Sequence, residues 1–596
     1  MKIIIQSLLL TILCSSYLYS TQLEDDSNNT LQLAIEQDSL ALVALYNSTE
    51  GDNWIKNTNW LSDSSISTWY GVHLDGNKRV NEIKLDGNNL VGKIPKEIDK
   101  LTKLEGLYLG RNSLSGDITF ELKTLSSLKY IKLDQNYFSG TIPIWLDQMV
   151  DLRYINFEFN KLNGNIPSEL GSLNKIETIR LKGNQLTGSI PKELGNLQKL
   201  QYLDLSYNRL IGSIPKEFGN LNHLGILNLD ENDLIGEIPK EICDLPYLLG
   251  LYLLDNELTG TIPTEIGNLK SLIHLQLSEN ELSGNIPIEL GNLKDLEYLN
   301  LGYNQLSGTI PVELGKLTKL SELILSINRL SGIIPDELGN LKLLETLYFR
   351  DNLLEGSIPD SFQELTKLNL FSIGDNSINE GLDNFPPQLM EKVWVYGNKF
   401  DFFDFQVSNV NTSRFLYEPQ DSLGEQEIVI LEEGEEYTLS SATEHVEGNM
   451  YKWFKDGQEV PNETNHDLVI ADAQKGVEGI YTCSVTNEIA PLLTLYRRPI
   501  TLTFDIFASV NPFIEITNEF KVYPNPARDF VAIEFSDSKS KGSIRVLDLL
   551  GSEVMSLDFN NQNRIDIDVS KFISGYYNII ITSDDKNYHQ SLFINR

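Results

Sequence analysis

The sequence is poor in cysteine and in positive charge. It has three cysteines among 596 residues, and 48 basic side chains against 84 acidic ones, which gives a net charge of −36. So little positive charge argues against a nucleic-acid partner and against docking on anionic lipid, because both need clustered Lys and Arg. The acidic excess favours solubility and self-repulsion of an extended surface, or alternatively the attraction of cationic ligands or calcium.

Long apolar runs are confined to the N-terminus. Lys2, the apolar stretch 3–13 and the small residue Ser20 predict a signal peptide over residues 1–20. A lipoprotein signal that uses Cys14 is the alternative, although the residue before it is bulkier than such signals favour. No later run is long enough to cross a membrane, so no transmembrane segment is predicted.

Cysteine pairs and catalytic constellations are missing as well. Once Cys14 is removed, Cys243 and Cys483 lie in different segments, so we expect buried apolar residues rather than a disulfide. None of the six histidines has metal-ligand spacing, and no H-E-x-x-H, C-x-x-C or G-x-S-x-G motif occurs. We therefore predict a protein that is not an enzyme and that binds no metal and no cofactor.

The sequence does contain a long series of asparagines, each 24 residues after the last. The series is Asn88, Asn112, Asn136, Asn160, Asn184, Asn208, Asn232, Asn256, Asn280, Asn304, Asn328, Asn352 and Asn376, and Asn398 follows after 22. Most copies lie in the frame L-x-x-L-x-x-L-x-L-x-x-N-x-L and continue with G-x-I-P, as in Gly212, Ile214 and Pro215. A repeat of this length predicts a solenoid, because one copy cannot bury its apolar side chains alone.

Each part of the repeat has a structural role. The L-x-L segment predicts a short strand whose leucines point inward, and stacked copies form a parallel sheet. An Asn side chain offers two donors and an acceptor, so it can bridge the turns of neighbouring coils. Glycine permits the bend that follows, and proline ends strand pairing. The asparagines are therefore expected to form a structural ladder and not a binding site.

The consensus L-x-G-x-I-P-x-x-L-G-x-L-x-x-L resembles the plant-type leucine-rich repeat. The resemblance covers residues 80–400 in about 14 copies. It implies an α/β-type leucine-rich-repeat solenoid, in which a parallel β-sheet lines a horseshoe.

Both ends of such a solenoid need a cap. Residues 21–79 are similar to the N-terminal cap of plant repeat proteins, on the strength of Trp54, Trp60, Trp69, Tyr70, Gly71 and Val72. Ser67 and Leu74 stand where that cap has two cysteines, so its disulfide is missing. Leu42, Leu45 and Tyr46 have helical spacing, with Asp38 as a possible N-cap. The aromatic cluster expected to close the other end is Phe400, Phe402, Phe403 and Phe405.

A linker is predicted over residues 401–424, which are irregular and polar. Short alternating segments over residues 425–504 then predict a β-sandwich. Trp453, and Tyr481 two residues before Cys483, resemble an immunoglobulin-like domain, with Leu439 in place of the partner cysteine. Such a domain is a recognition module or a spacer.

A third module is expected over residues 519–596, after a second linker at 505–518. Its motifs are V-Y-P-N-P, V-L-D-L-L-G, S-G-Y-Y and Q-S-L-F-I, in that order. Together they resemble the C-terminal sorting domain of the type IX secretion system. The resemblance implies that the secretion machinery is a partner, and that the protein is secreted or held on the outer surface of a Gram-negative bacterium.

The positions that flank L-x-L are expected to face the concave side of the solenoid. Counting back from each ladder asparagine, the candidate ligand-binding residues are Tyr108, Tyr130, Tyr154, Tyr202, Asp204, Tyr207, Tyr252, Tyr298, Tyr303, Tyr348 and Trp394. Tyrosine combines a large contact area with a hydroxyl group. The alternative is that tyrosine simply suits a strand and packs on the next coil.

The function that these patterns favour is recognition outside the cell. We expect a non-enzymatic, secreted or cell-surface protein that binds an extracellular peptide, protein or glycan on the concave face. A structural or adhesive surface matrix protein is the alternative, and an enzyme with an unrecognised site is a remote one.

Overall fold

The structure is a computed structural model that describes residues 29–386, 392–408, 415–504 and 520–594. Short gaps within the last range fall at 524–526, 528–529, 540, 548–552, 561, 573–574 and 584–585. The expected signal peptide, Cys14 and the linker 505–518 lie outside the described residues, as do parts of the first three C-terminal motifs. Among the described residues, every helix is too short or too polar to cross a membrane.

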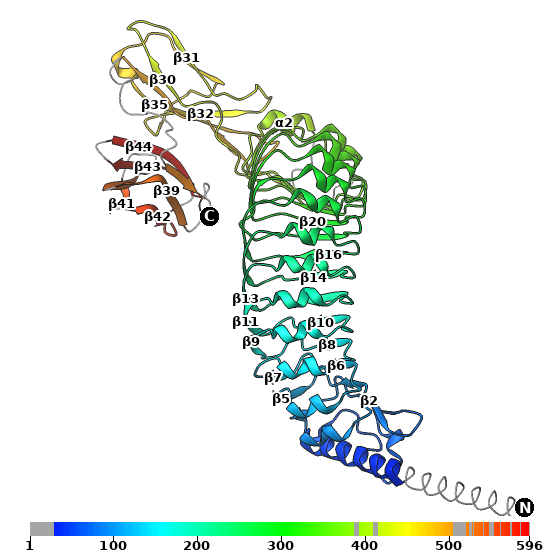
Figure 1. The fold of residues 1–596 in the computed structure, drawn as a ribbon. Helices are drawn as coiled ribbons and strands as arrows, with labels where there is room; N and C mark the ends of the chain where they lie inside the picture. The colour runs from blue at the N-terminus through cyan, green and yellow to red at the C-terminus, as the bar shows by residue number, and fades with distance from the viewer. Residues whose placement is uncertain are drawn as a thin grey trace, which may run out of the picture. The chain divides into compact units, whose positions relative to one another are not determined.

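The repeats form stacked coils, each of which adds one strand to a long sheet (Figure 1). β1 pairs antiparallel with β2, and from β2 to β28 each strand pairs in parallel with the next. The strands are β1 Val72–Leu74, β2 Val80–Lys84, β4 Gly106–Tyr108, β6 Tyr130–Lys132, β8 Tyr154–Asn156, β10 Thr178–Arg180, β12 Tyr202–Asp204, β14 Ile226–Asn228, β16 Gly250–Tyr252, β18 His274–Gln276, β20 Tyr298–Asn300, β22 Glu322–Ile324, β24 Thr346–Tyr348, β26 Leu370–Ser372 and β28 Lys392–Trp394. This arrangement confirms the predicted leucine-rich-repeat solenoid.

The rest of most coils carries a second short strand and one turn of 3-10 helix. The second strands form smaller parallel sheets. Those used below are β5 Ser113–Asp117, β13 Arg209–Gly212, β15 Asp233–Gly236 and β17 Glu257–Leu258. The helical turn follows the proline, as in η7 at Lys192–Asn196, where Pro191 is in extended conformation and precedes the turn. Leucine and isoleucine from all these segments fill the inside of the coils.

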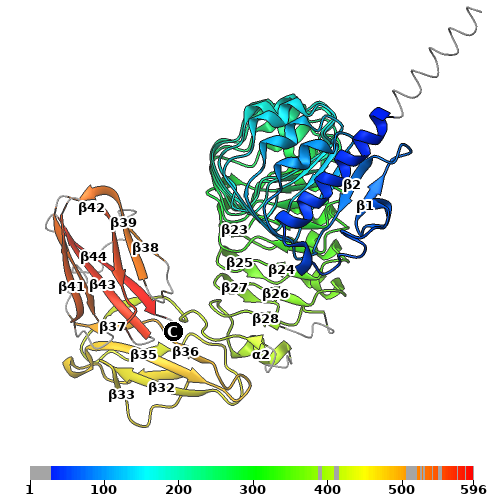
Figure 2. The ribbon, with the colours of Figure 1, turned by 90° about the horizontal axis from the view of Figure 1, so that it is seen from below.

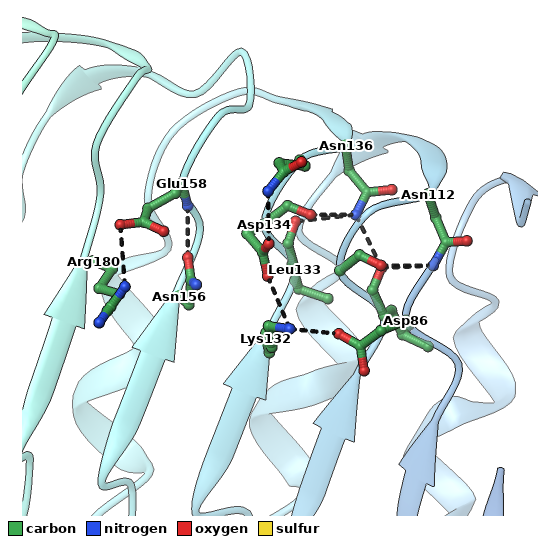
Figure 3. A network of polar contacts seen from close by, with 12 residues as sticks. Asp86, Asn112, Lys132, Leu133, Asp134, Asn136, Asn156, Glu158 and Arg180 are labelled. Atoms are coloured by element: carbon green, nitrogen blue, oxygen red, sulfur yellow. Dashed lines mark hydrogen bonds and ion pairs between the residues drawn. The ribbon is translucent and has the colours of Figure 1, made fainter. Parts of the chain in front are cut away.

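The ladder asparagines make the hydrogen bonds that tie the coils together. The side-chain amide of Asn208 donates to the carbonyl of Leu181 in the preceding coil at 3.1 Å. It also donates to the carbonyls of Leu205 and Ser206 in its own coil, at 3.0 and 3.1 Å. Its oxygen accepts the backbone N–H of Leu186 at 3.1 Å. Equivalent bonds recur at the other rungs, for example at Asn112 and Asn136 in Figure 3.

A helix over residues 29–48 covers the first coil (Figure 2). Asp38 lies in the middle of this helix, so the expectation that it caps the N-terminus is wrong. Its carboxylate is fully buried and accepts Nε and Nη2 of Arg79 at 2.8 Å each, and the backbone N–H of Val80 at 2.8 Å. Three donors from the start of β2 therefore hold the helix to the sheet.

Aromatic packing takes the place of a disulfide in this cap. The rings of Trp54 and Trp60 are 4.8 Å apart, and those of Trp60 and Trp69 are 5.0 Å apart. Tyr46 of the helix lies 5.1 Å from Trp54. The indole N–H groups of Trp54 and Trp60 donate to backbone carbonyls at 2.9 Å, so the cluster buries no unpaired donor at these two rings.

The described parts of the predicted linker 401–424 are residues 401–408 and 415–424. They contain the helix α2 at Phe402–Ser408. Phe400, Phe402 and Phe405 are buried, as an end cluster requires, but Phe403 is 47% exposed. Phe403 therefore does not belong to the buried cluster, because helical geometry turns it away from the side that holds its neighbours.

All-β domains follow. The first comprises β30 Glu427–Ile430, β31 Tyr437–Ser440, β32 Met450–Lys455, β33 Gln458–Glu459, β34 Asp467–Ile470, β35 Gly479–Thr486, β36 Thr494–Tyr496 and β37 Ile500–Thr503. A larger sheet contains β30, β37, β35, β36, β32 and β33, and β31 pairs with β34. Trp453 is fully buried and lies opposite Cys483 in the β32–β35 ladder.

The last domain has two sheets over a shared apolar core. One sheet contains β38 Phe520–Tyr523, β39 Phe530–Lys539 and β42 Gln562–Asp568, and the other contains β41 Glu553–Phe559, β40 Gly542–Leu547, β43 Gly575–Ser583 and β44 Lys586–Ile594. Alternate residues of both sheets are buried between them, which is the pattern of a sandwich.

Candidate functional site

The long sheet has an open face, which we call the outer face. In β12 the central Leu203 is fully buried, and its neighbours Tyr202 and Asp204 point to the other side of the strand. The outer face comprises the residues six, four, two and one positions before each ladder asparagine. Parallel register places equal positions of successive coils side by side, so that Tyr202 lies between Thr178 and Ile226.

The predicted tyrosines do not form one patch on this face. Ring contacts join Tyr108 to Tyr130 at 6.4 Å, and Tyr252 to His274 and on to Tyr298 at 6.2 and 6.1 Å. Farther along, Tyr348 and Trp394 meet edge to face at 6.2 Å. The candidates therefore lie in separate groups. His274, which was not among the predicted site residues, completes the second group.

Burial keeps the hydroxyls of five tyrosines on this face in the neutral form. Burial raises the pKa of Tyr108 to about 12, and it also raises the pKa of Tyr202, Tyr252, Tyr298 and Tyr348. All are only partly buried. These side chains can therefore stack on a ligand and donate a hydrogen bond, but they supply no charge.

The charges of the first coils are paired with one another (Figure 3). Lys132 Nζ lies 2.8 Å from the Asp86 carboxylate and 3.8 Å from Asp134. Arg180 lies 3.8 Å from Glu158, and its guanidinium carbon is 4.2 Å from the ring centre of Tyr202. These coils therefore largely neutralise their own charge.

The central coils carry acids without such partners. Burial raises the pKa of Asp230 to about 7, and its carboxylate accepts the backbone N–H of Leu254 at 2.7 Å. Glu231 takes a hydrogen bond from the hydroxyl of Tyr207, which raises the pKa of that tyrosine. Asp255 is exposed one coil farther on. This part of the outer face is acidic.

Asp204 is held by its own turn. It is 3% exposed, and one carboxylate oxygen accepts the backbone N–H of Ser206 at 3.0 Å and its hydroxyl at 2.6 Å. Asn156 and Asn228 accept the same backbone N–H bond in their coils. The position four before the ladder asparagine thus also supports the turn, a role that sequence reasoning missed.

Tyr207 and Tyr303 stand in a row that has an unusual backbone. Both have positive φ, 56° and 53°, as do the residues at this position in most coils. Glycine occupies the same position at 87, 183 and 397, where φ is 60°, 67° and 62°. Residues with a side chain are strained in this conformation. The repeat period locates this row, but the sequence does not show its left-handed conformation.

The described residues place neither a metal-ligand cluster nor a reactive cysteine beside this face. Among the described residues, no group of three or more His, Cys, Asp or Glu could hold a metal ion. Cys243 and Cys483 are buried and free, and burial raises the pKa of each to about 12, so neither is a reactive thiolate.

Comparison with protein families agrees with this geometry. Residues 184–329 match a leucine-rich repeat region, and residues 318–378 and 151–173 match leucine-rich repeats. Residues 521–595 match a secretion system C-terminal sorting domain. The chain carries leucine-rich repeats and a C-terminal sorting domain. Among curated proteins, none matches the chain.

Solved plant receptors share the repeat fold. The structure of PEPR1 with AtPEP1 is 28% identical over 66% of this chain and 62% of that one, with a TM-score of 0.53. The leucine-rich-repeat ectodomain of the Arabidopsis receptor kinase HAESA, in complex with an extended IDA peptide hormone, is 30% identical over 62% of each chain, with a TM-score of 0.55. The chain thus spans about 62% of the length of these two receptors.

Proposed function

We propose that this protein is a non-enzymatic extracellular recognition protein, and that the outer face of its repeat sheet, taken as the concave face of the horseshoe, binds a peptide, protein or glycan. The observation that carries the proposal is the row Tyr252, His274 and Tyr298. Tyr252 and His274 stack, His274 and Tyr298 are tilted against each other, and all three residues remain partly exposed, so part of their surface is available to a ligand. Such rings offer stacking area at low entropic cost. A peptide hormone bound to the HAESA ectodomain supports this use of the fold.

We further propose that residues 425–504 form an immunoglobulin-like spacer. The hydroxyl of Tyr481 donates to the carbonyl of Val477 at 2.8 Å, which is the contact expected of a tyrosine corner. The buried Trp453 opposite Cys483, and the buried Leu439 in β31, fit the same pattern without a disulfide. A spacer needs no binding site of its own.

The sorting domain implies secretion or display on the outer surface. We propose the outer surface of a Gram-negative bacterium, reached through a signal peptide at residues 1–20 and the type IX machinery. Removal of residues 521–595 should then leave the protein in the periplasm, as measured by cell fractionation. Unchanged delivery to the surface would contradict the assignment.

Binding can be tested with the secreted chain on peptide and glycan arrays. Replacing Tyr202 and Tyr252 with Ala should weaken capture of whichever ligand is found, at an unchanged circular dichroism spectrum. The matched control replaces Tyr137 and Tyr247, which are 51% and 61% exposed and lie off the outer face. Equal loss in both variants would contradict a site on the outer face. Self-association without ligand capture would favour an adhesive matrix protein.

A further inference from the structure

Basic residues disappear from the outer face in its central coils. The four outer-face positions contain no Lys or Arg from Tyr202 to Ile327, a stretch that the structure describes completely. The acids at these positions are Asp204, Asp230, Glu231, Asp255, Glu279 and Glu322. In the coils before them, Lys84, Arg111, Lys132, Arg180 and Lys182 alternate with acids. Along one continuous sheet, the outer face therefore changes from mixed positive and negative charge to negative charge alone.

The central acids also lack ion-pair partners. Among the described residues, the ion pairs of the outer face stop at Arg180–Glu158 and resume at Arg350–Asp351. Asp204, Asp230 and Glu231 are bonded only to neutral groups, as described above. A carboxylate that is partly desolvated and faces other carboxylates is stabilised by a cation brought next to it.

The acids border the aromatic row Tyr252, His274 and Tyr298. The pKa of Tyr252 is raised by burial and, to a smaller extent, by the negative charge of Asp230. Asp255 follows Tyr252 by three residues, and Glu279 follows His274 by five, each in the row with positive φ. Acids beside ring faces form a surface that suits a guanidinium or ammonium group, since the ring attracts the cation and the carboxylate neutralises it.

We propose that this central surface, defined by Asp230, Glu231, Asp255, Glu279, Tyr252, His274 and Tyr298, binds a Lys- or Arg-containing peptide segment of a partner protein. The proposal rests on the recognition function above and names its ligand class. A neutral glycan can donate hydroxyl hydrogen bonds to these acids, but it brings no positive charge to neutralise them. A metal ion would need a group of ligands that the described residues do not provide. A cationic peptide matches both the charge and the aromatic row.

The direct test is titration of the full secreted chain with a short peptide in which Arg alternates with Ser. Matched peptides carry Gln or Glu in place of Arg, and spermine serves as a cation without a peptide backbone. We expect the Arg peptide to bind, with an affinity that falls as salt rises, and the Glu peptide not to bind. Absence of binding by the Arg peptide, or equal binding by spermine, would overturn the proposal.

A triple variant and a matched triple control locate the site. Glu231→Gln, Asp255→Asn and Glu279→Gln together should weaken binding of the Arg peptide about tenfold, as expected for three partly exposed charges. The control is Asp233→Asn, Glu257→Gln and Glu281→Gln, which are exposed residues two positions farther along the same coils and off the outer face. Both variants change the net charge equally.

The outcomes separate this inference from the broader function. Equal losses in the two variants would show an effect of net charge alone and would overturn the site. If the Gln peptide binds as well as the Arg peptide and the Tyr252→Ala variant loses both, recognition on the outer face stands and the cationic ligand is refuted.

Discussion

The N-terminal cap and the coils pair their buried polar groups in different ways, one with charged side chains and the other with neutral ones. The cap uses one fully charged pair, Asp38 with Arg79, drawn from a helix and a strand far apart in the sequence. The coils use a neutral amide that recurs at every rung and bonds to backbone groups of its own and a neighbouring coil. A neutral amide carries no charge to desolvate, so it can be repeated, whereas a buried ion pair is stable only where both partners are supplied.

The two systems meet at the first rung. Asn88 has no preceding coil, and its side chain instead donates to the carbonyl of Lys56 at 2.9 Å and accepts the backbone N–H of Lys56 at 2.7 Å. The cap therefore presents a backbone that imitates a coil. This difference predicts how strongly each part responds to substitution.

The largest effect is expected in the cap. Asp38→Ala leaves the guanidinium of Arg79 buried without a counter-charge, and should lower the free energy of unfolding of the repeat region by about 3–5 kcal/mol. Chemical denaturation followed by tryptophan fluorescence measures it, since the tryptophan cluster lies in the cap. The double variant Asp38→Leu with Arg79→Met should lose much less. An equal loss would mean that packing and not charge holds the cap.

A rung of the ladder should matter less. Asn208→Ala leaves the backbone N–H of Leu186 without its acceptor and removes one of two amide donors from each of the carbonyls of Leu181 and Leu205, and we expect a loss of about 1–3 kcal/mol. Asn222→Ala, which removes an exposed amide, is the control and should change stability by less than about 0.5 kcal/mol. An unchanged melting temperature for Asn208→Ala would contradict the ladder.

In the acidic central coils, substitution of a buried acid should raise the stability and not lower it. Burial raises the pKa of Asp230 to about 7, and Asp204, Glu231 and Lys182 are the charged groups near it. The folded chain holds this proton more tightly than the unfolded chain, so the stability that it contributes is full below about pH 4 and is lost as pH rises through 7.

Asp230→Asn should therefore stabilise the protein by about 1–2 kcal/mol at pH 8, after allowance for solvent screening, and leave it unchanged at pH 4. Asparagine keeps the oxygen that accepts the N–H of Leu254. Melting curves at the two pH values test the sign, and a destabilised variant at pH 8 would refute it.

The smallest effect concerns the row with positive φ. Arg111 has a φ of 54° and an exposed side chain, and Gly87 holds the equivalent place one coil earlier. Arg111→Gly should stabilise by about 0.5–1 kcal/mol because it relieves the left-handed strain. Arg111→Ala keeps the strain and should give no gain. Thermal unfolding of the two variants distinguishes backbone strain from loss of the side chain.

Much of the fold and of the candidate site follows from the repeat period alone. Counting from the asparagines identified the strands, the buried leucines and the positions of the outer face, because each coil must present the same groups in the same register. The counting did not show that Asp204 is tied to Ser206, or that the row of Tyr207 has positive φ. Both depend on the backbone path of the turn, which the period locates but does not describe.

The sequence by itself determined the solenoid, the sorting domain and the absence of a recognisable catalytic motif. These are local or periodic properties, and each repeats or carries its own motif. Only the tertiary structure decided that Asp38 pairs with Arg79 and does not cap a helix, that Phe403 turns outward, and that the charges of the first coils cancel while those of the central coils do not. The physical reason is that pairing, burial and desolvation depend on which side chains meet in space. The identity of one residue in the sequence does not show which residues those are.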